Sequence, residues 1–191
     1  MAATVEFSET NGAAGSPTTT DGIANINFGT VDSPNITPAS HPIIVGGFSF
    51  GKWLRFHVSA MGGSTAVSNL RFYKSSGAYV TGEVIGGNPN DVSSDNSYNI
   101  TSYAHATTAA GGGLVTVPVT GNGSTVLSNA YSILPVPTSL PAHNVSIGNA
   151  VAGSIIAAGY SDYIFLGLAT TGSTPAGAVN QKVFSLTFDE T

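Results

Sequence analysis

The sequence contains no cysteine, which excludes disulfide bonds, thiol catalysis and zinc bound by thiolates. Charge is also scarce, since Asp, Glu, Lys and Arg make up 8% of the 191 residues, against about 25% in an average soluble protein. With five basic residues and a net charge of −5, we expect no affinity for nucleic acid or for anionic membranes. Ser, Thr, Asn and Gly must therefore supply most of the polar surface.

Long hydrophobic segments are missing as well. The apolar runs are much shorter than the ~20 residues that a membrane-spanning helix needs. The first residues, MAATVEFSET, have neither the basic nor the apolar region of a signal peptide. We therefore expect synthesis in the cytoplasm, or a leader that has been removed.

A helical pattern is not found either, because no stretch keeps apolar residues at i, i+3 and i+4 while 24 Gly and 10 Pro interrupt the chain. Alternation of period two recurs instead and predicts strands. About ten short strands separated by Gly/Pro turns indicate one antiparallel β-sandwich domain over 1–191, jelly-roll or immunoglobulin-like. The predicted strands are 3–7, 22–29, 43–50, 52–59, 67–74, 77–85, 98–105, 113–120, 123–128, 144–148, 152–157, 161–169 and 182–188.

Residues 8–21, SETNGAAGSPTTTD, carry no hydrophobic pattern. Their composition predicts a flexible loop or an N-terminal arm. An arm of this kind is suited to pairing with a neighbouring subunit, whereas an extended surface loop explains the same residues without a partner.

The stretch KWLRFHV, residues 52–58, holds the only tryptophan. In a strand, Leu54, Phe56 and Val58 lie on one face and are predicted to be core, while Trp53, Arg55 and His57 lie on the opposite face. The segment NLRFYK repeats the arrangement, and pairing of 52–59 with 67–74 would create one shared face. We regard that face as a candidate contact surface, an ordinary outer sheet face, or a sugar-stacking platform; its members are Trp53, Arg55, His57, Arg71 and Tyr73.

Candidate reaction chemistry is sparse. No Gly-x-Ser-x-Gly elbow occurs, and no two histidines have a metal-ligand spacing, so we predict hydrogen-bonded or solvated histidines, no cofactor and no metal. Most acidic residues lie at termini or in loops. Glu83 and Asp162 stand near apolar strand ends, where burial can raise a carboxyl pKa. We therefore predict no catalytic residue and a protein that is not an enzyme.

The loop NPNDVSSDN, within 88–96, offers oxygen ligands suited to calcium from Asn90, Asp91, Asp95 and Asn96. The EF-hand spacing and its closing glutamate are absent. A turn-forming loop explains the same residues through side-chain bonds to the backbone, so the calcium question stays open here.

Five segments give the chain an overall similarity to a known class of proteins. In chain order they are GIANINFGTVDSPN, HPIIVGGFSFGKWLRFHV, NLRFYKSSG, GYSDYIFLGL and AGAVNQKVFSLTFDET. The chain resembles virion structural proteins of tailed bacteriophages and related prokaryotic viruses, either capsid-decoration or tail-associated. The resemblance implies an all-β protein located in the virion, which binds the major capsid protein or another virion protein and forms a homo-oligomer such as a trimer. It carries no functional residue across. The alternative functions are a carbohydrate-binding or adhesin-like module and a hydrolase on a jelly-roll scaffold.

Overall fold

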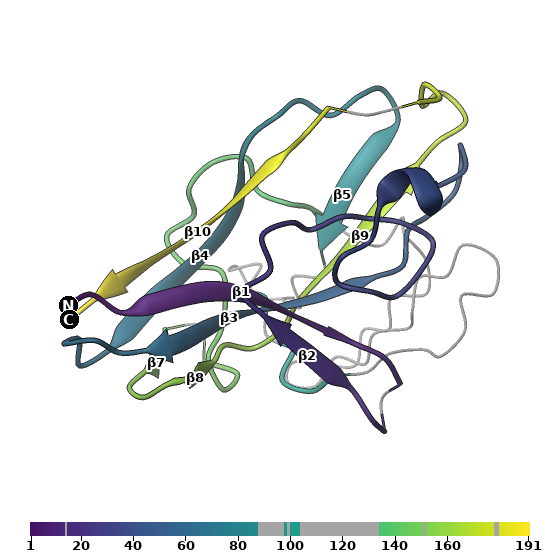
Figure 1. Ribbon diagram of the computed structural model, residues 1–191. Coiled ribbons are helices and arrows are strands. Elements are labelled where there is room, and N and C mark those ends of the chain that lie inside the picture. Colours follow the sequence, from purple (N-terminus) through teal and green to yellow (C-terminus); the bar gives the residue numbers. More distant parts are fainter. Residues whose placement is uncertain (14, 88–97, 99, 104–133, 151, 178–179) are drawn as a thin grey trace.

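The computed structural model describes residues 1–13, 15–87, 98, 100–103, 134–150, 152–177 and 180–191. Two antiparallel sheets lie against each other in a sandwich-like arrangement (Figure 1). This confirms the expected all-β sandwich. Among the described residues, no helix has the length and apolar character needed to cross a membrane.

The larger sheet has the order β2-β1-β3-β9-β5-β6, and β8 also pairs with β3. The smaller sheet has the order β10-β4-β7. A 3-10 helix, η1, spans Pro38–Ser40. The strands are β1 (Thr4–Asn11), β2 (Thr18–Asp21), β3 (Lys52–Ala60), β4 (Val67–Ser76), β5 (Glu83–Gly87), β6 (Leu134–Pro135), β7 (Ser154–Ile155), β8 (Gly159–Tyr160), β9 (Ile164–Thr170) and β10 (Val183–Glu190).

The main core lies between the two sheets. Leu54, Phe56 and Val58 of β3 are fully buried, as their alternation predicted. The ring of Phe7 on β1 contacts Phe56 in its own sheet and Phe72 on β4 of the other sheet, with ring centroids 6.0 and 5.9 Å apart. Aromatic edge-to-face contacts of this kind therefore join the two layers.

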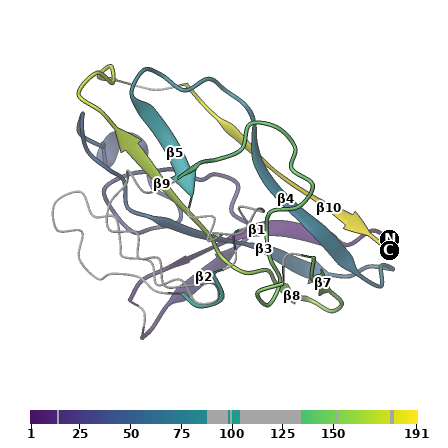
Figure 2. The same ribbon diagram turned by 180° about the vertical axis from the view of Figure 1, so that it is seen from behind.

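Strands 52–59 and 67–74 do not pair, contrary to our expectation. β3 pairs with β1, β8 and β9, whereas β4 pairs with β10 and β7. The turn between β3 and β4 carries the chain from one sheet to the other. Figure 2 shows β4 and β10 side by side, apart from the β1–β3 pair.

The expectation of a loop or arm over 8–21 was wrong for most of that segment. Residues 8–11 continue β1, and 18–21 form β2, so the chain makes a hairpin there. The four residues from Ser8 to Asn11 are buried although all are polar. These residues form a strand because they pair with β2 on one side and β3 on the other, although they have no apolar alternation.

Other strand predictions differ in extent. Segment 22–29 forms no strand, and segment 43–50 contributes only an isolated bridge at Phe48. Segments 98–105 and 144–148 meet through a bridge between Tyr98 and Val145. Segments 77–85, 152–157 and 161–169 contain or overlap β5, β7 and β9. The predictions for 113–120 and 123–128 lie outside the described residues.

Both chain ends lie together at one end of the sandwich (Figure 1). The Ala3 amide donates a hydrogen bond to Glu190 Oε1 at 2.7 Å, and the Gly63 amide donates to the Met1 carbonyl at 2.6 Å. The first and last residues are thus fastened to the β3–β4 turn.

Candidate functional site

The side chains of Trp53, Arg55 and His57 share one face of β3, as predicted. Aromatic side chains of the same chain cover this face. Trp53 lies opposite Phe165 in the β3–β9 pairing, and His57 lies opposite Tyr160 in the β3–β8 pairing. The His57 and Tyr160 rings stack with centroids 4.3 Å apart. The strand register therefore places an aromatic ring beside Trp53 and another beside His57.

Arg55 lies between these two pairs along β3. Its guanidinium carbon is 4.6 Å from the centroid of the Tyr160 ring and 4.5 Å from that of Tyr163. Its Nε also donates a 2.8 Å hydrogen bond to the Ser161 carbonyl. The predicted cation–π contact exists, but its rings come from the segment 160–163 and not from β4.

Trp53 cannot serve as a contact residue in this fold, because its side chain is 0% exposed. It forms a second core cluster with Ile100, Tyr163 and Phe165, against which Tyr103 packs. Three of those rings lie edge-on to the indole, with centroids 5.2 to 5.6 Å away. Trp53 therefore has a structural role, and its indole cannot stack on a sugar as the sugar-platform hypothesis requires.

Arg71 and Tyr73 belong to β4 in the smaller sheet, so the five predicted residues do not form a single face. The Arg71 guanidinium makes a bidentate pair with Asp189 of β10, at 2.8 and 2.9 Å. Tyr73 is half-buried beside Ser185 in the β4–β10 register. The shared-face prediction failed because the β3–β4 connection crosses between sheets.

A cluster of one imidazole and two carboxylates lies at the His57 end of β3. Glu6 of β1 is the direct cross-strand partner of His57, and Asp21 of β2 reaches the same point. His57 Nδ1 is 3.0 Å from Glu6 Oε1 and 3.5 Å from Asp21 Oδ1. The sequence does not reveal this cluster, because the polar segment 8–21 has no alternation that would predict the β1–β2 hairpin.

Neighbouring hydroxyl groups hold the Asp21 carboxylate in place. Ser8 Oγ donates to Asp21 Oδ1 at 2.6 Å, and the Tyr160 hydroxyl lies 3.1 Å from both carboxylate oxygens. Burial, followed by the hydrogen bond to Asp21, raises the pKa of Tyr160, so its hydroxyl stays a donor. The carboxylate is therefore fixed from two sides.

A buried ion pair lies further along the same strands. Lys52 Nζ is 2.8 Å from Glu9 Oε1 and donates a 2.6 Å bond to the Ser33 carbonyl. Burial raises the pKa of Glu9, against the opposing effect of Lys52. Asn11 Nδ2 links Glu9 to Asp32. Because Glu9, Asn11 and Lys52 are buried, this ion pair is not accessible to a ligand.

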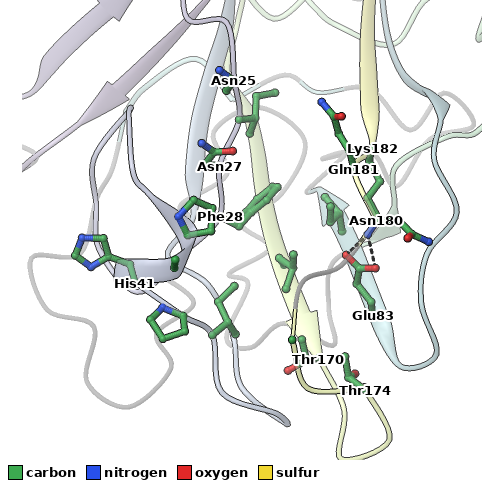
Figure 3. A pocket seen from close by; sticks show the side chains of 18 of the residues that line it. Asn25, Asn27, Phe28, His41, Glu83, Thr170, Thr174, Asn180, Gln181 and Lys182 are labelled. Atoms are coloured by element: carbon green, nitrogen blue, oxygen red, sulfur yellow. Dashed lines mark hydrogen bonds and ion pairs between the residues drawn. The ribbon is translucent and has the colours of Figure 1, made fainter.

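A cavity of about 1190 Å³ lies at the β5–β9 end of the molecule. Its apolar wall includes Ile23, Phe28 and Leu168. Figure 3 shows amide side chains on its two sides, among them Asn25 and Gln181. The cavity also contains a buried ion pair between Lys182 and Glu83, with an Nζ–Oε2 distance of 2.5 Å.

The remaining sequence candidates are dispersed. His41 lines the cavity, His143 lies in a separate loop, and His105 lies outside the described residues. Asp162 has its pKa raised by burial, as its position predicted, and accepts hydrogen bonds from the Gly148 and Asn149 amides. The proposed calcium loop at 88–96 lies outside the described residues.

Comparison with known proteins adds no relative. No family model, no curated protein and no solved structure matches this chain.

Proposed function

We propose that this chain is a non-enzymatic structural protein of a virus particle, which binds the capsid surface and copies of itself. The observation that carries the proposal is that the positive charges of the chain are engaged by its own residues. All five basic side chains make interactions within the chain, so its partner-facing surface is built from uncharged polar groups, scattered apolar side chains and acids.

Two lysines belong to enclosed ion pairs, Lys52 with Glu9 and Lys182 with Glu83. Lys74 is 8% exposed and donates a hydrogen bond to the Gly77 carbonyl. Of the two arginines, Arg55 lies over two tyrosine rings and Arg71 forms an ion pair with Asp189. Positive charge is therefore not offered to a nucleic acid or to an acidic partner.

Contacts made by such a surface depend little on ionic strength, because salt screens exposed charges and hardly affects apolar or neutral polar contacts. Exposed apolar side chains provide anchors for such contacts. Ile44 is 75% exposed beside Val45, and Ile156, which directly follows β7 of the smaller sheet, is 76% exposed. Both suit burial against a neighbouring subunit.

The test is co-sedimentation of the purified chain with particles that lack it, at low and at high salt. We expect binding at both salt concentrations and self-association of the free chain. The double variant Ile44→Ser/Val45→Ser should reduce binding, while Ser75→Ala, an exposed polar change on β4, should not. A chain that stays monomeric and does not bind particles would contradict the proposal.

A second candidate function is a carbohydrate-binding or adhesin-like module, and the cavity favours it. Amide groups such as those of Asn25 and Gln181 face an apolar wall, which is a combination that suits sugar hydroxyls and sugar faces. Glycan-array binding that is lost in Asn25→Ala/Gln181→Ala and kept in Ser75→Ala would support it. A negative array would remove it.

A further inference from the structure

Three side chains of the kinds that bind metal ions in proteins meet near the β2 edge of the larger sheet, each from a different strand. The β1–β3 register sets Glu6 opposite His57, and the β1–β2 register sets Ser8 opposite Asp21. One ligand atom from each of Glu6, Asp21 and His57 lies within 4.8 Å of the other two. The grouping is thus a product of strand pairing, not of sequence spacing.

The distances suit a small tetrahedral ion. With metal–ligand bonds of about 2.0–2.1 Å, ligand atoms around zinc are separated by about 3.3 Å. The two separations measured from His57 Nδ1, 3.0 Å to Glu6 and 3.5 Å to Asp21, lie on either side of that value. An ion at this point would take the place of the proton between His57 Nδ1 and Glu6 Oε1, and the Glu6 and Asp21 oxygens, which lie within 4.8 Å of each other, would close around it.

The surrounding groups orient these ligands, as outer-shell partners do in metal sites. Tyr160 stacks on the imidazole, while its hydroxyl lies equally close to both Asp21 oxygens and keeps one when a cation takes the other. Ser8 holds Asp21 from the opposite strand. Gly22 has φ +67°, and a Cβ there would approach Glu6 Oε2 to 3.1 Å, so glycine leaves room for that carboxylate.

Access from solvent is also present. The side chains of His57, Glu6 and Asp21 are 16%, 32% and 40% exposed, so an ion can enter and water can complete its coordination. Arg55, the nearest cation on β3, is held over the Tyr160 and Tyr163 rings and by the Ser161 carbonyl. Two carboxylates with one imidazole match zinc and similar transition-metal ions better than Ca²⁺ or Mg²⁺, which favour oxygen ligands alone.

We propose that Glu6, Asp21 and His57 form a binding site for a divalent transition-metal ion of the zinc type. The ion joins β1, β2 and β3 and stabilises the N-terminal hairpin on the sheet. This site is independent of the virion and carbohydrate proposals, and its failure leaves both unchanged.

The experiment is titration of the chelator-treated full chain with ZnCl₂ by calorimetry, together with thermal unfolding with and without Zn²⁺. We expect one ion per chain, a higher Tm with Zn²⁺, and no comparable effect of CaCl₂ or MgCl₂. His57→Gln and Asp21→Asn should abolish the Zn²⁺ effects. Ser8→Ala, which removes only an orienting hydroxyl, should weaken Zn²⁺ binding about 10-fold or more.

His143→Gln is the matched control, because it removes a loop histidine far from the cluster in sequence and should leave binding unchanged. Circular dichroism of each variant without metal separates loss of the site from loss of the fold. If Glu6 and Asp21 merely accept a hydrogen bond from His57, Zn²⁺ will neither bind nor raise Tm in the wild-type chain. That result, or equal binding by His57→Gln, would overturn the proposal.

Discussion

The tripeptide Leu-Arg-Phe occurs twice, on β3 and on β4, and the two copies have the same inward face but different outward faces. Leu54 and Phe56 on β3, and Leu70 and Phe72 on β4, are all nearly or completely buried between the sheets. Arg55 is covered by two tyrosine rings, whereas Arg71 pairs with the partly exposed Asp189. Local sequence decides which side chains point inward, while neighbouring strands decide what meets the outward ones.

The largest effects should be shared by the two copies. Phe56→Ala and Phe72→Ala each remove a fully buried ring from the inter-sheet core, so we expect a loss of about 3–5 kcal/mol in the free energy of unfolding for both. Denaturant unfolding measures this loss. If the loss for one variant were less than about half the loss for the other, its sheet would contribute less to the common core than the burial indicates.

The lysines that flank the two copies should differ. Lys52→Met leaves the Glu9 carboxylate enclosed without its cation, and we expect a loss of about 3 kcal/mol, at the lower end for broken buried pairs because Glu9 can take up a proton. Lys74→Met removes a bond to the Gly77 carbonyl and should cost about 1 kcal/mol.

The control for the lysine pair is Lys52→Met combined with Glu9→Gln. This double variant should recover part of the lost free energy of unfolding, since the buried charge is gone. Equal losses for Lys52→Met and Lys74→Met would contradict the distinction between the two strands.

The arginines should differ next. Arg55→Met loses two ring contacts and a hydrogen bond, so we expect a loss of about 2 kcal/mol that is insensitive to salt. Arg71→Met should cost less, and its difference from wild type should shrink as salt is added, because its pair with Asp189 is near the surface. Unfolding at low and high salt measures both, and the reverse salt dependence would refute the assignment.

The smallest effects concern acidic pH. Hydrogen bonds from Arg71 and Asn69 lower the pKa of Asp189 below its ordinary 3.8, so its stabilising contribution is complete above pH 3.8 and is lost as the pH falls through the folded-state pKa. Asp162 has the opposite sign, because burial raises its pKa above 3.8 and stability falls as the pH rises through that window.

Asp189→Asn should flatten the low-pH fall in stability, and Asp162→Asn should remove the opposite slope. Equilibrium unfolding across the acidic range measures both variants against wild type. If both variants changed the slope in the same direction, the buried and exposed carboxylates would not differ as described.

Alternation of side chains was sufficient to predict the all-β class and the inward residues of β3 and β4. It failed at residues 8–11, because a polar strand has no apolar alternation; Ser8, Glu9, Thr10 and Asn11 are buried through pairing with β2 and β3. The predicted contact face failed for a related reason. Nothing within 52–59 or 67–74 specifies that β3 pairs with β9 and β4 with β10.

The sequence by itself determined the parity of KWLRFHV, because successive side chains of a strand point to opposite faces wherever the strand is placed. Only the tertiary structure decided that Trp53 is enclosed by Tyr163 and Phe165, that Arg55 lies over two tyrosines, and that His57 meets Glu6 and Asp21. Some of these contacts join residues that are more than 100 positions apart in the sequence. Strand register, which is set by the whole sheet, therefore controls the chemistry available at this face.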